Sequence, residues 1–111
     1  MSERIDENVF DKLADRTLGA LEVALNEVDG LEADLESGIL TIEFPDGSRF
    51  VVNSHRAARQ IWMAAAAQAW HFDANPEGSR WTASKTHEEL WSCLKGQVER
   101  KLGHPIELKT A

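Results

Sequence analysis

The apolar residues of this 111-residue chain change their spacing twice, and any fold it adopts has to accommodate both changes. Over residues 7–28 they recur at every third or fourth position, which is typical of one face of an α-helix. Over residues 31–83 they mostly alternate with polar residues, which is typical of β-strands. Helical spacing returns over residues 90–102. The order of helix, strands and helix predicts an α+β fold.

The first helix is expected to span about residues 7–28, with Asp6 or Asn8 as its N-cap and Asp29-Gly30 at its end. Its apolar face comprises Phe10, Leu13, Ala14, Thr17, Leu21, Ala24, Leu25 and Val28. The last helix is expected to open with a capping box over residues 86–89 and to end at Gly103. Residues 106–108 then lie back across the helices.

Short strands are expected over residues 31–36, 39–44, 48–53, 59–64, 69–73 and 80–83. The turns Ser37-Gly38 and Pro45-Asp46-Gly47 separate the first three of them. The pattern predicts a single domain over residues 1–111. Its architecture is a two-layer α-β sandwich, with the N- and C-terminal helices packed on one face of an antiparallel sheet of about five to six strands.

The composition excludes several classes of protein. Cys93 is the only cysteine, which rules out an internal disulfide, a cysteine-rich zinc site and a self-held iron–sulfur cluster. No apolar run approaches the roughly 20 residues that cross a bilayer, and the first residues match neither a secretory signal nor a transit peptide. We therefore expect a cytoplasmic protein with no membrane partner.

Negative charge is concentrated in the first part of the chain. The formal net charge is −7, but residues 1–47 carry −10 and residues 48–111 carry +3. Eight carboxylates and no lysine or arginine lie between Arg16 and Arg49. Because phosphates would be repelled, nucleic acid is not an expected partner. A cation or a basic protein surface is the natural complement.

The acidic residues form a candidate metal site. A helical wheel places Asp11, Asp15, Glu22 and Asp29 in one stripe beside the apolar face, and Glu27 near its opposite edge. The next strand turns Glu32, Asp34 and Glu36 toward solvent, so packing it beside the helix end would bring the two sets together. Oxygen ligands without histidine or cysteine predict weak, multi-site binding of Fe²⁺, Fe³⁺, Mn²⁺, Ca²⁺ or Mg²⁺. The alternative is an ordinary solvated face.

Trp62 is a second candidate. If Ile61 and Met63 face the core, then Gln60 and Trp62 face away from it, and His71 does the same on the next strand. An outward tryptophan on a sheet face without helices indicates a docking surface, because aromatic side chains anchor interfaces. The alternative is that Trp62 packs under a loop or that the strand is one residue out of phase.

Motifs for catalysis are missing. The chain has no glycine-rich phosphate loop, no Cys–His nucleophile signature and no His-x-x-x-His pair. Its histidines are scattered over different predicted elements, and Cys93 is expected to be an inert, partly buried thiol. Ferroxidase activity is the only chemistry to suggest, and the carboxylate-bridged two-iron pattern that it requires is absent from the sequence. We do not expect an enzyme.

Motifs along nearly the whole chain resemble the frataxin family in its bacterial CyaY-type form. The residues that carry the resemblance are Leu13-Ala14-Asp15, Gly38-Ile39-Leu40-Thr41-Ile42-Glu43-Phe44, Asp46-Gly47-Ser48, Asn53, Gln60-Ile61-Trp62-Met63-Ala64, Trp70-His71-Phe72-Asp73, Trp81 and Glu89-Leu90-Trp91-x-x-Leu94. The Gln-Ile-Trp strand after an asparagine-led loop is the most specific of them. Departures occur in the loop after Asn53, which reads Ser54-His55-Arg56-Ala57 where the family usually has Gln and Pro. Val23 and Asn26 also stand where the family often has further acids.

The resemblance implies an accessory protein of iron–sulfur cluster assembly that binds Fe²⁺ or Fe³⁺ weakly and needs no organic cofactor. It also implies contact with a cysteine desulfurase and its scaffold protein, by a monomer whose oligomerisation with metal is left open. A metal-independent acidic adaptor is the alternative. Our candidate metal residues are Asp11, Asp15, Glu22, Glu27, Asp29, Glu32 and Asp34. Our candidate partner-binding residues are Glu36, Asn53, Gln60, Trp62 and His71.

Overall fold

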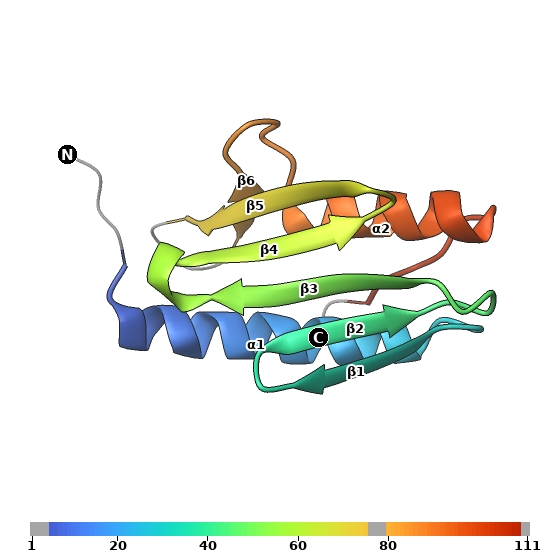
Figure 1. Ribbon diagram of the computed structural model, residues 1–111, viewed down its shortest axis with the longest axis horizontal. Helices are drawn as coiled ribbons and strands as arrows, with labels where there is room; N and C mark the ends of the chain where they lie inside the picture. Colours follow the sequence, from blue (N-terminus) through green and yellow to red (C-terminus); the bar gives the residue numbers. More distant parts are fainter. Residues whose placement is uncertain (1–4, 76–79, 110–111) are drawn as a thin grey trace.

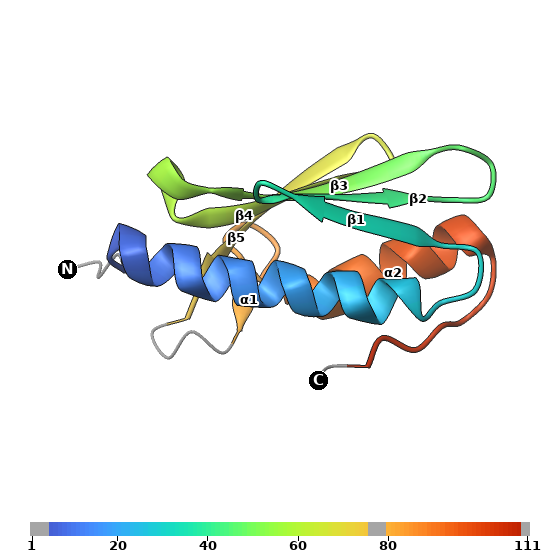
Figure 2. The ribbon, with the colours of Figure 1, turned by 90° about the horizontal axis from the view of Figure 1, so that it is seen from below.

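A computed structural model describes residues 5–75 and 80–109 of the chain. Its elements are α1 (Glu7–Asn26), β1 (Glu32–Glu36), β2 (Ile39–Glu43), β3 (Arg49–His55), a 3₁₀ turn (Arg56–Ala58), β4 (Gln60–Ala65), β5 (Gln68–Ala74), β6 (Trp81–Ala83) and α2 (Leu90–Leu102). The six strands form one antiparallel sheet whose spatial order is their order in the chain. Both helices lie on one face of that sheet (Figures 1 and 2), which confirms the predicted α+β sandwich.

The core lies between the helices and the sheet. Buried and exposed side chains alternate along the strands, and the buried ones face the core. The remaining core side chains come from the two helices. The fully buried face of α1 runs through Phe10, Ala14, Leu18, Leu21 and Leu25. Leu18 was absent from the predicted face.

Thr17 was predicted to belong to the apolar face of α1, but it is only half-buried. Its hydroxyl accepts a hydrogen bond from Trp81 Nε1 at 2.9 Å. The indole of Trp81 is buried and meets the ring of Phe10 edge-on, with the ring centroids 5.8 Å apart. The threonine therefore accepts from a buried donor of β6 and links α1 to the edge of the sheet that β6 forms.

The helix α1 ends at Asn26, two residues earlier than the spacing of apolar residues predicted. The N–H groups of Glu27 and Val28 donate to carbonyls three residues back, at 3.3 and 3.1 Å, which tightens the last turn. Gly30 then adopts a φ of 90° and directs the chain into β1. Residues 27–29 consequently lie outside the helix. The helical wheel used in the sequence analysis therefore does not apply to the side chains of Glu27 and Asp29.

The helix α2 begins at Leu90, four residues after Thr86, the first residue of the predicted capping box. Glu89 is its N-cap, and its carboxylate accepts from the N–H of Ser92 at 3.1 Å. Thr86 accepts from the N–H of Glu88 at 3.3 Å and so stabilises a turn before the helix. The predicted start was wrong because the threonine caps this turn.

The strand β3 runs two residues further than predicted and includes His55. After the 3₁₀ turn, Arg59 takes up a left-handed conformation with φ 54° and the chain re-enters the sheet at Gln60. Residue 80 was predicted to begin the last strand, but β6 starts at Trp81. The rest of the strand order agrees with the sequence.

The segment after α2 turns back along the helical layer (Figure 2). Its residues Ile106 and Leu108 pack partly buried against the core, as predicted for this tail. The N–H of Ile106 donates to the carboxylate of Glu99 at 3.0 Å, which holds the start of the segment against α2. No helix within the described residues is both long and apolar enough to cross a membrane.

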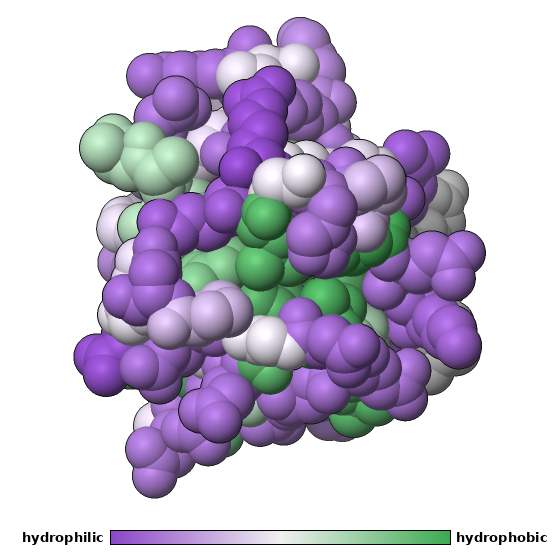
Figure 3. All heavy atoms as spheres, turned by 90° about the vertical axis from the view of Figure 1, so that its right-hand side faces the viewer, coloured by the Kyte–Doolittle hydropathy of each residue, from purple (hydrophilic) through white to green (hydrophobic). Residues whose placement is uncertain are grey.

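The β2–β3 turn is tied to the end of α2 by an ion pair. Lys101 Nζ lies 2.9 Å from Asp46 Oδ2, while Asp46 Oδ1 accepts from the hydroxyl and the N–H of Ser48 at 2.6 and 2.9 Å. Figure 3 views this end of the molecule, where hydrophobic residues show at the centre and hydrophilic residues surround them. The hydrogen bonds from Ser48, together with Lys101, hold the pKa of Asp46 well below its usual range.

We expect Asp46→Asn to change how stability depends on pH. A carboxylate whose pKa is lowered by folding contributes stability that is complete above its unfolded pKa, near 4, and is lost as the pH falls below that value. Thermal midpoints should therefore fall more steeply from pH 5 to pH 3 in the parent protein than in the variant. Parallel curves for the two proteins would contradict this role of Asp46.

Candidate functional site

Side chains of α1 bond directly to the free edge of β1. Asn26 Nδ2 donates to the carbonyl of Ala33 at 2.9 Å, and Asn26 Oδ1 accepts from the N–H of the same residue at 2.8 Å. One helical turn earlier, Glu22 Oε2 accepts from the N–H of Leu35 at 2.8 Å. Because β1 pairs with β2 alone among the strands of the described residues, these outward backbone groups have no strand there to bond. The helix takes the place of that strand.

This contact assembles what we call the acidic edge, a set of carboxylates from the end of α1, the α1–β1 turn and β1. Its members are Glu22, Glu27, Asp29, Glu32, Asp34 and Glu36. Glu22 is half-buried by its contact with β1, and the other five side chains are exposed. The register of β1 turns Ala33 and Leu35 toward the core and leaves the three strand acids on the outer side.

The acidic edge borders two shallow depressions. One has a volume of about 480 Å³ and is lined by Glu27, Asp29 and the tail after α2, including His104, Glu107 and Lys109. The other, of about 370 Å³, lies between residues 30–32 and residues 43–45. In each depression, carboxylates from two segments that are distant in the sequence face the same solvent-filled space.

Among the described residues, no lysine, arginine or histidine forms an ion pair with any member of the acidic edge. Glu32 even lies directly opposite Glu43 across the β1–β2 ladder, and like charges in that position repel each other. The edge therefore presents a concentrated negative field, which attracts cations and basic surfaces.

Asp11 and Asp15 were also predicted to bind metal, and they lie apart from the acidic edge, toward the start of α1. Arg56 Nε contacts Asp11 Oδ2 at 2.9 Å, and the same guanidinium reaches Glu7 at 3.3 Å. The carboxylate of Asp11 thus has a counter-ion. Asp15 is exposed and forms no ion pair with a described residue.

Over residues 5–75 and 80–109, no three side chains of histidine, cysteine, aspartate or glutamate converge as ligands for one metal ion. The thiol of Cys93 is buried, and burial together with the nearby Glu88 raises its pKa to about 12, so it stays protonated. The chemistry that remains is cation attraction by separate carboxylates, with water completing the shell of a bound ion.

The outer face of the sheet carries the other predicted residues. The registers of successive strands place Glu36, Ile39, Asn53, Trp62 and His71 opposite one another, in a single row across five strands. Four of these five residues were predicted to bind a partner. Ile39, the fifth, is 49% exposed and adds an apolar side chain to the row.

Three rings stack in the middle of this face. The indole of Trp62 lies between His55 and His71, with centroid distances of 3.8 and 4.3 Å and interplanar angles of 14° and 15°. Trp62 Nε1 donates to Gln60 Oε1 at 2.8 Å, and Gln60 Nε2 donates to Asp73 Oδ1 at 3.1 Å. His55 Nδ1 is buried without a hydrogen-bond partner among the described residues. The stack and the two bonds hold the tryptophan in one orientation.

The sequence did not predict His55 and Asp73 as members of this surface. Both follow from a period of two: His55 continues the alternation of Asn53 beyond the predicted strand end, and Asp73 continues that of His71. Arg56 and Arg59, which pair with acids at the start of α1, carried no comparable signal, because their contacts join residues far apart in the chain.

Comparison with known proteins gives one consistent result. The family model described as a frataxin-like domain matches residues 3–104. A protein of Cupriavidus metallidurans named iron-sulfur cluster assembly protein CyaY is 33% identical over 110 residues, which cover 95% of this chain and 97% of that protein. A protein of Pseudomonas fluorescens with the same name is 38% identical over 102 residues, covering 90% and 92%.

Solved structures show the same fold. The frataxin of Psychromonas ingrahamii superposes with a TM-score of 0.85 at 21% identity, covering 95% of this chain and 99% of that one. A trimeric frataxin of the yeast Saccharomyces cerevisiae, complexed with ferrous iron, gives a TM-score of 0.64 at 24% identity, covering 93% and 91%.

We expect Asn26→Ala to lower the free energy of unfolding by about 1–2 kcal/mol, because it leaves the N–H and C=O of Ala33 without partners. Urea unfolding measures the change. Val23→Ala is the matched control, since Val23 is 60% exposed on the same helix and its truncation should change stability little. Equal effects of the two substitutions would show that the bonds to β1 contribute nothing.

Proposed function

Because this chain belongs to the frataxin-like family, we propose that it is an accessory protein of iron–sulfur cluster assembly in the cytoplasm. Relatives of nearly the same length are named for that process, and a frataxin of the same fold has been solved with ferrous iron. In this proposal iron is a cargo, held weakly as Fe²⁺ or Fe³⁺ by the acidic edge. The protein docks on a cysteine desulfurase and its scaffold protein.

The observation that carries the iron-binding part is the set of carboxylates along the acidic edge that form no ion pair with any residue the structure describes. Several separate carboxylates around solvent attract Fe²⁺ or Fe³⁺ without enclosing it, so the ion exchanges quickly. Fast exchange suits a protein that has to give its iron up. Glu27, Asp29, Glu32 and Asp34 are exposed and free to rearrange around an ion, whereas Glu22 also serves β1.

We assign docking to two surfaces that bind through different interactions. The acidic edge supplies long-range attraction to a basic patch on the desulfurase, which raises the rate of association and weakens with salt. The row across the outer sheet face, centred on Trp62, supplies a contact with apolar and aromatic character. The stacked rings hold Trp62 ready for contact, which reduces the entropy lost on binding.

A metal-independent acidic adaptor is the second candidate. The observation in its favour is that no three potential ligands converge on one point in the described part of the chain. In that case the acidic edge recognises only a basic protein surface. Chelation of iron separates the two candidates, because partner binding by an adaptor is unchanged when iron is removed.

We expect Fe²⁺, added without oxygen, to broaden amide NMR signals along residues 22–36. Glu32→Gln with Asp34→Asn should weaken this binding about tenfold, since each removed charge costs the bound ion somewhat under 1 kcal/mol at a solvated site. Asp6→Asn with Glu88→Gln is the matched control. It makes the same change in net charge and keeps the acceptors for Asn8 and Trp70.

Equal iron affinity in the two double variants would contradict the assignment to the acidic edge. Broadening confined to residues outside this edge would contradict it as well. Neither result would bear on the outer sheet face.

We expect Trp62→Ala to weaken binding to the desulfurase–scaffold complex about thirtyfold, as the loss of a central aromatic anchor does. Val51→Ala, on the same outer face two strand positions from Asn53, is the control and should change affinity less than threefold. Titration calorimetry at low and high salt measures both. Full affinity in the tryptophan variant would remove the outer face from the proposed interface.

A further inference from the structure

The strand β5 is longer than the strand that should cover its outer edge. It spans Gln68–Ala74, and every residue except Ala74 pairs with β4 on one side. On the other side, β6 pairs only with Phe72, Asp73 and Ala74. After Ala83 the chain turns away, so within the described residues no strand covers the edge of β5 over residues 68–71.

The ladder pattern identifies the backbone groups on this edge. Asn75 donates to the carbonyl of Arg80 at 2.9 Å, and bonded pairs recur at every second residue of an antiparallel ladder. The N–H and C=O of Asp73 therefore face β6, and those of His71 and Ala69 point the same way with no strand opposite. Ala83 bonds instead to residues 87 and 88, which confirms that it faces away from β5.

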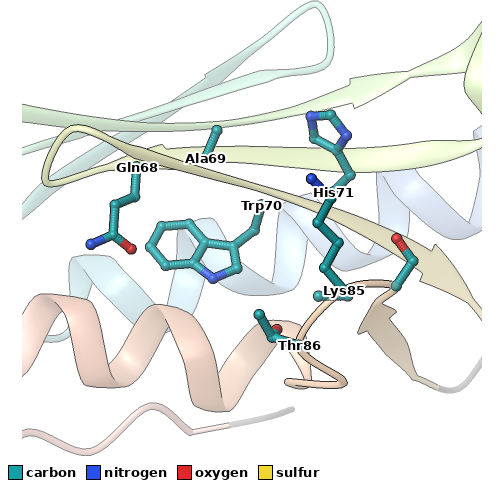
Figure 4. A pocket seen from close by; sticks show the side chains of 8 residues that line it. Gln68, Ala69, Trp70, His71, Lys85 and Thr86 are labelled. Carbon is teal, nitrogen blue, oxygen red and sulfur yellow. The ribbon is translucent and has the colours of Figure 1, made fainter.

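A pocket of about 390 Å³ opens beside this free edge. It lies between the first half of β5 and the turn after β6, and its wall includes Gln68, Trp70, Ser84, Lys85 and Thr86. Figure 4 shows the indole of Trp70 beneath the strand and the side chain of Lys85 reaching up toward β5. The indole nitrogen is already bonded to Glu88 at 3.1 Å, so Trp70 is fixed as part of the wall.

We propose that the free edge of β5 and the adjoining pocket bind an extended segment of a partner protein, which adds a strand to the sheet and places an acidic side chain against Lys85. Ala69 and His71 offer the backbone groups for such a strand, at the two-residue spacing that strand addition uses. The pocket receives a side chain beside Trp70.

The charge of the pocket indicates what kind of segment fits. In a protein of net charge −7, none of the eight residues lining this pocket is acidic, and Lys85 is the one with a permanent positive charge. Lys85 forms no ion pair with a described residue. The nearby Glu88 is engaged by the indole of Trp70. An acidic residue on the incoming strand is the complement.

This site is separate from the surfaces of the proposed function. The acidic edge lies at β1 and the free edge lies at β5 and β6, at opposite ends of the strand order. His71 contributes its ring to the outer face but its backbone to the free edge. The two halves of the sheet could hold an acidic segment and a basic surface at the same time.

Amide hydrogen exchange tests the premise in the protein alone. The amides of Ala69 and His71 should exchange at least tenfold faster than those of Trp70 and Phe72, which face β4. Equal protection of all four amides would mean that the edge is already covered, and would overturn the proposal.

The binding test uses a capped hexapeptide of alternating threonine and valine with one central glutamate. We expect NMR shifts centred on Ala69 and His71, with slower exchange of both amides when the peptide is bound. Lys85→Glu should weaken binding about fivefold, the effect of losing an exposed ion pair, and Lys12→Glu on α1 is its charge-matched control. Ala69→Pro should abolish binding, because it removes an N–H of the free edge but no bond to β4.

Several results would overturn the proposal. One is equal binding of a peptide with lysine in place of glutamate, and another is an effect of Lys85→Glu no larger than that of Lys12→Glu. Shifts of the same residues by acetate at the same concentration would indicate a small-anion pocket. Shifts that depend on protein concentration without peptide would indicate that a second copy of the chain covers the edge.

Discussion

The bonds from Asn26 and Glu22 to the backbone of β1 determine where the charge of this protein lies. They satisfy an edge strand that would otherwise be open, and in doing so they fix the end of α1 beside a strand with three outward acids. An acid at position 26 could accept from Ala33 but could not donate to it, whereas an amide does both. Asn26 therefore adds no charge to the acidic edge, but its two hydrogen bonds hold α1 against β1.

The sheet register provides the second organising constraint. Because side chains alternate, the same pairing that buries the core also lines up Asn53, Trp62 and His71 on the outer face. The sheet thus has three regions with different character: an acidic edge, an aromatic outer face and, at β5, an open strand edge. Separate surfaces of this kind fit the proposed contact with more than one component of an assembly machinery.

Local pattern predicted most of the fold, because periodicity and turn residues specify elements directly. It failed where a contact between distant residues decided the outcome. The predicted helix 7–28 ends at Asn26, whose side chain bonds to β1. Burial of Leu18 and the bond between Thr17 and Trp81 likewise depend on how α1 lies on the sheet. In the candidate site, strand phase correctly placed Trp62 outward, but the Asp11–Arg56 pair joins residues 45 positions apart and had no local signal.

The thermal midpoint of the protein with added Fe²⁺, measured without oxygen and at constant ionic strength, tests the central claim most directly. The carboxylates of the acidic edge repel one another in the native state, so a cation that binds them there should stabilise the folded protein by linkage. Iron at ten times its dissociation constant adds about 1.4 kcal/mol, or about 6 °C for a chain of this size. The account predicts such a rise, and a smaller one when Glu32 and Asp34 are neutralised. A midpoint that does not move with iron would contradict it.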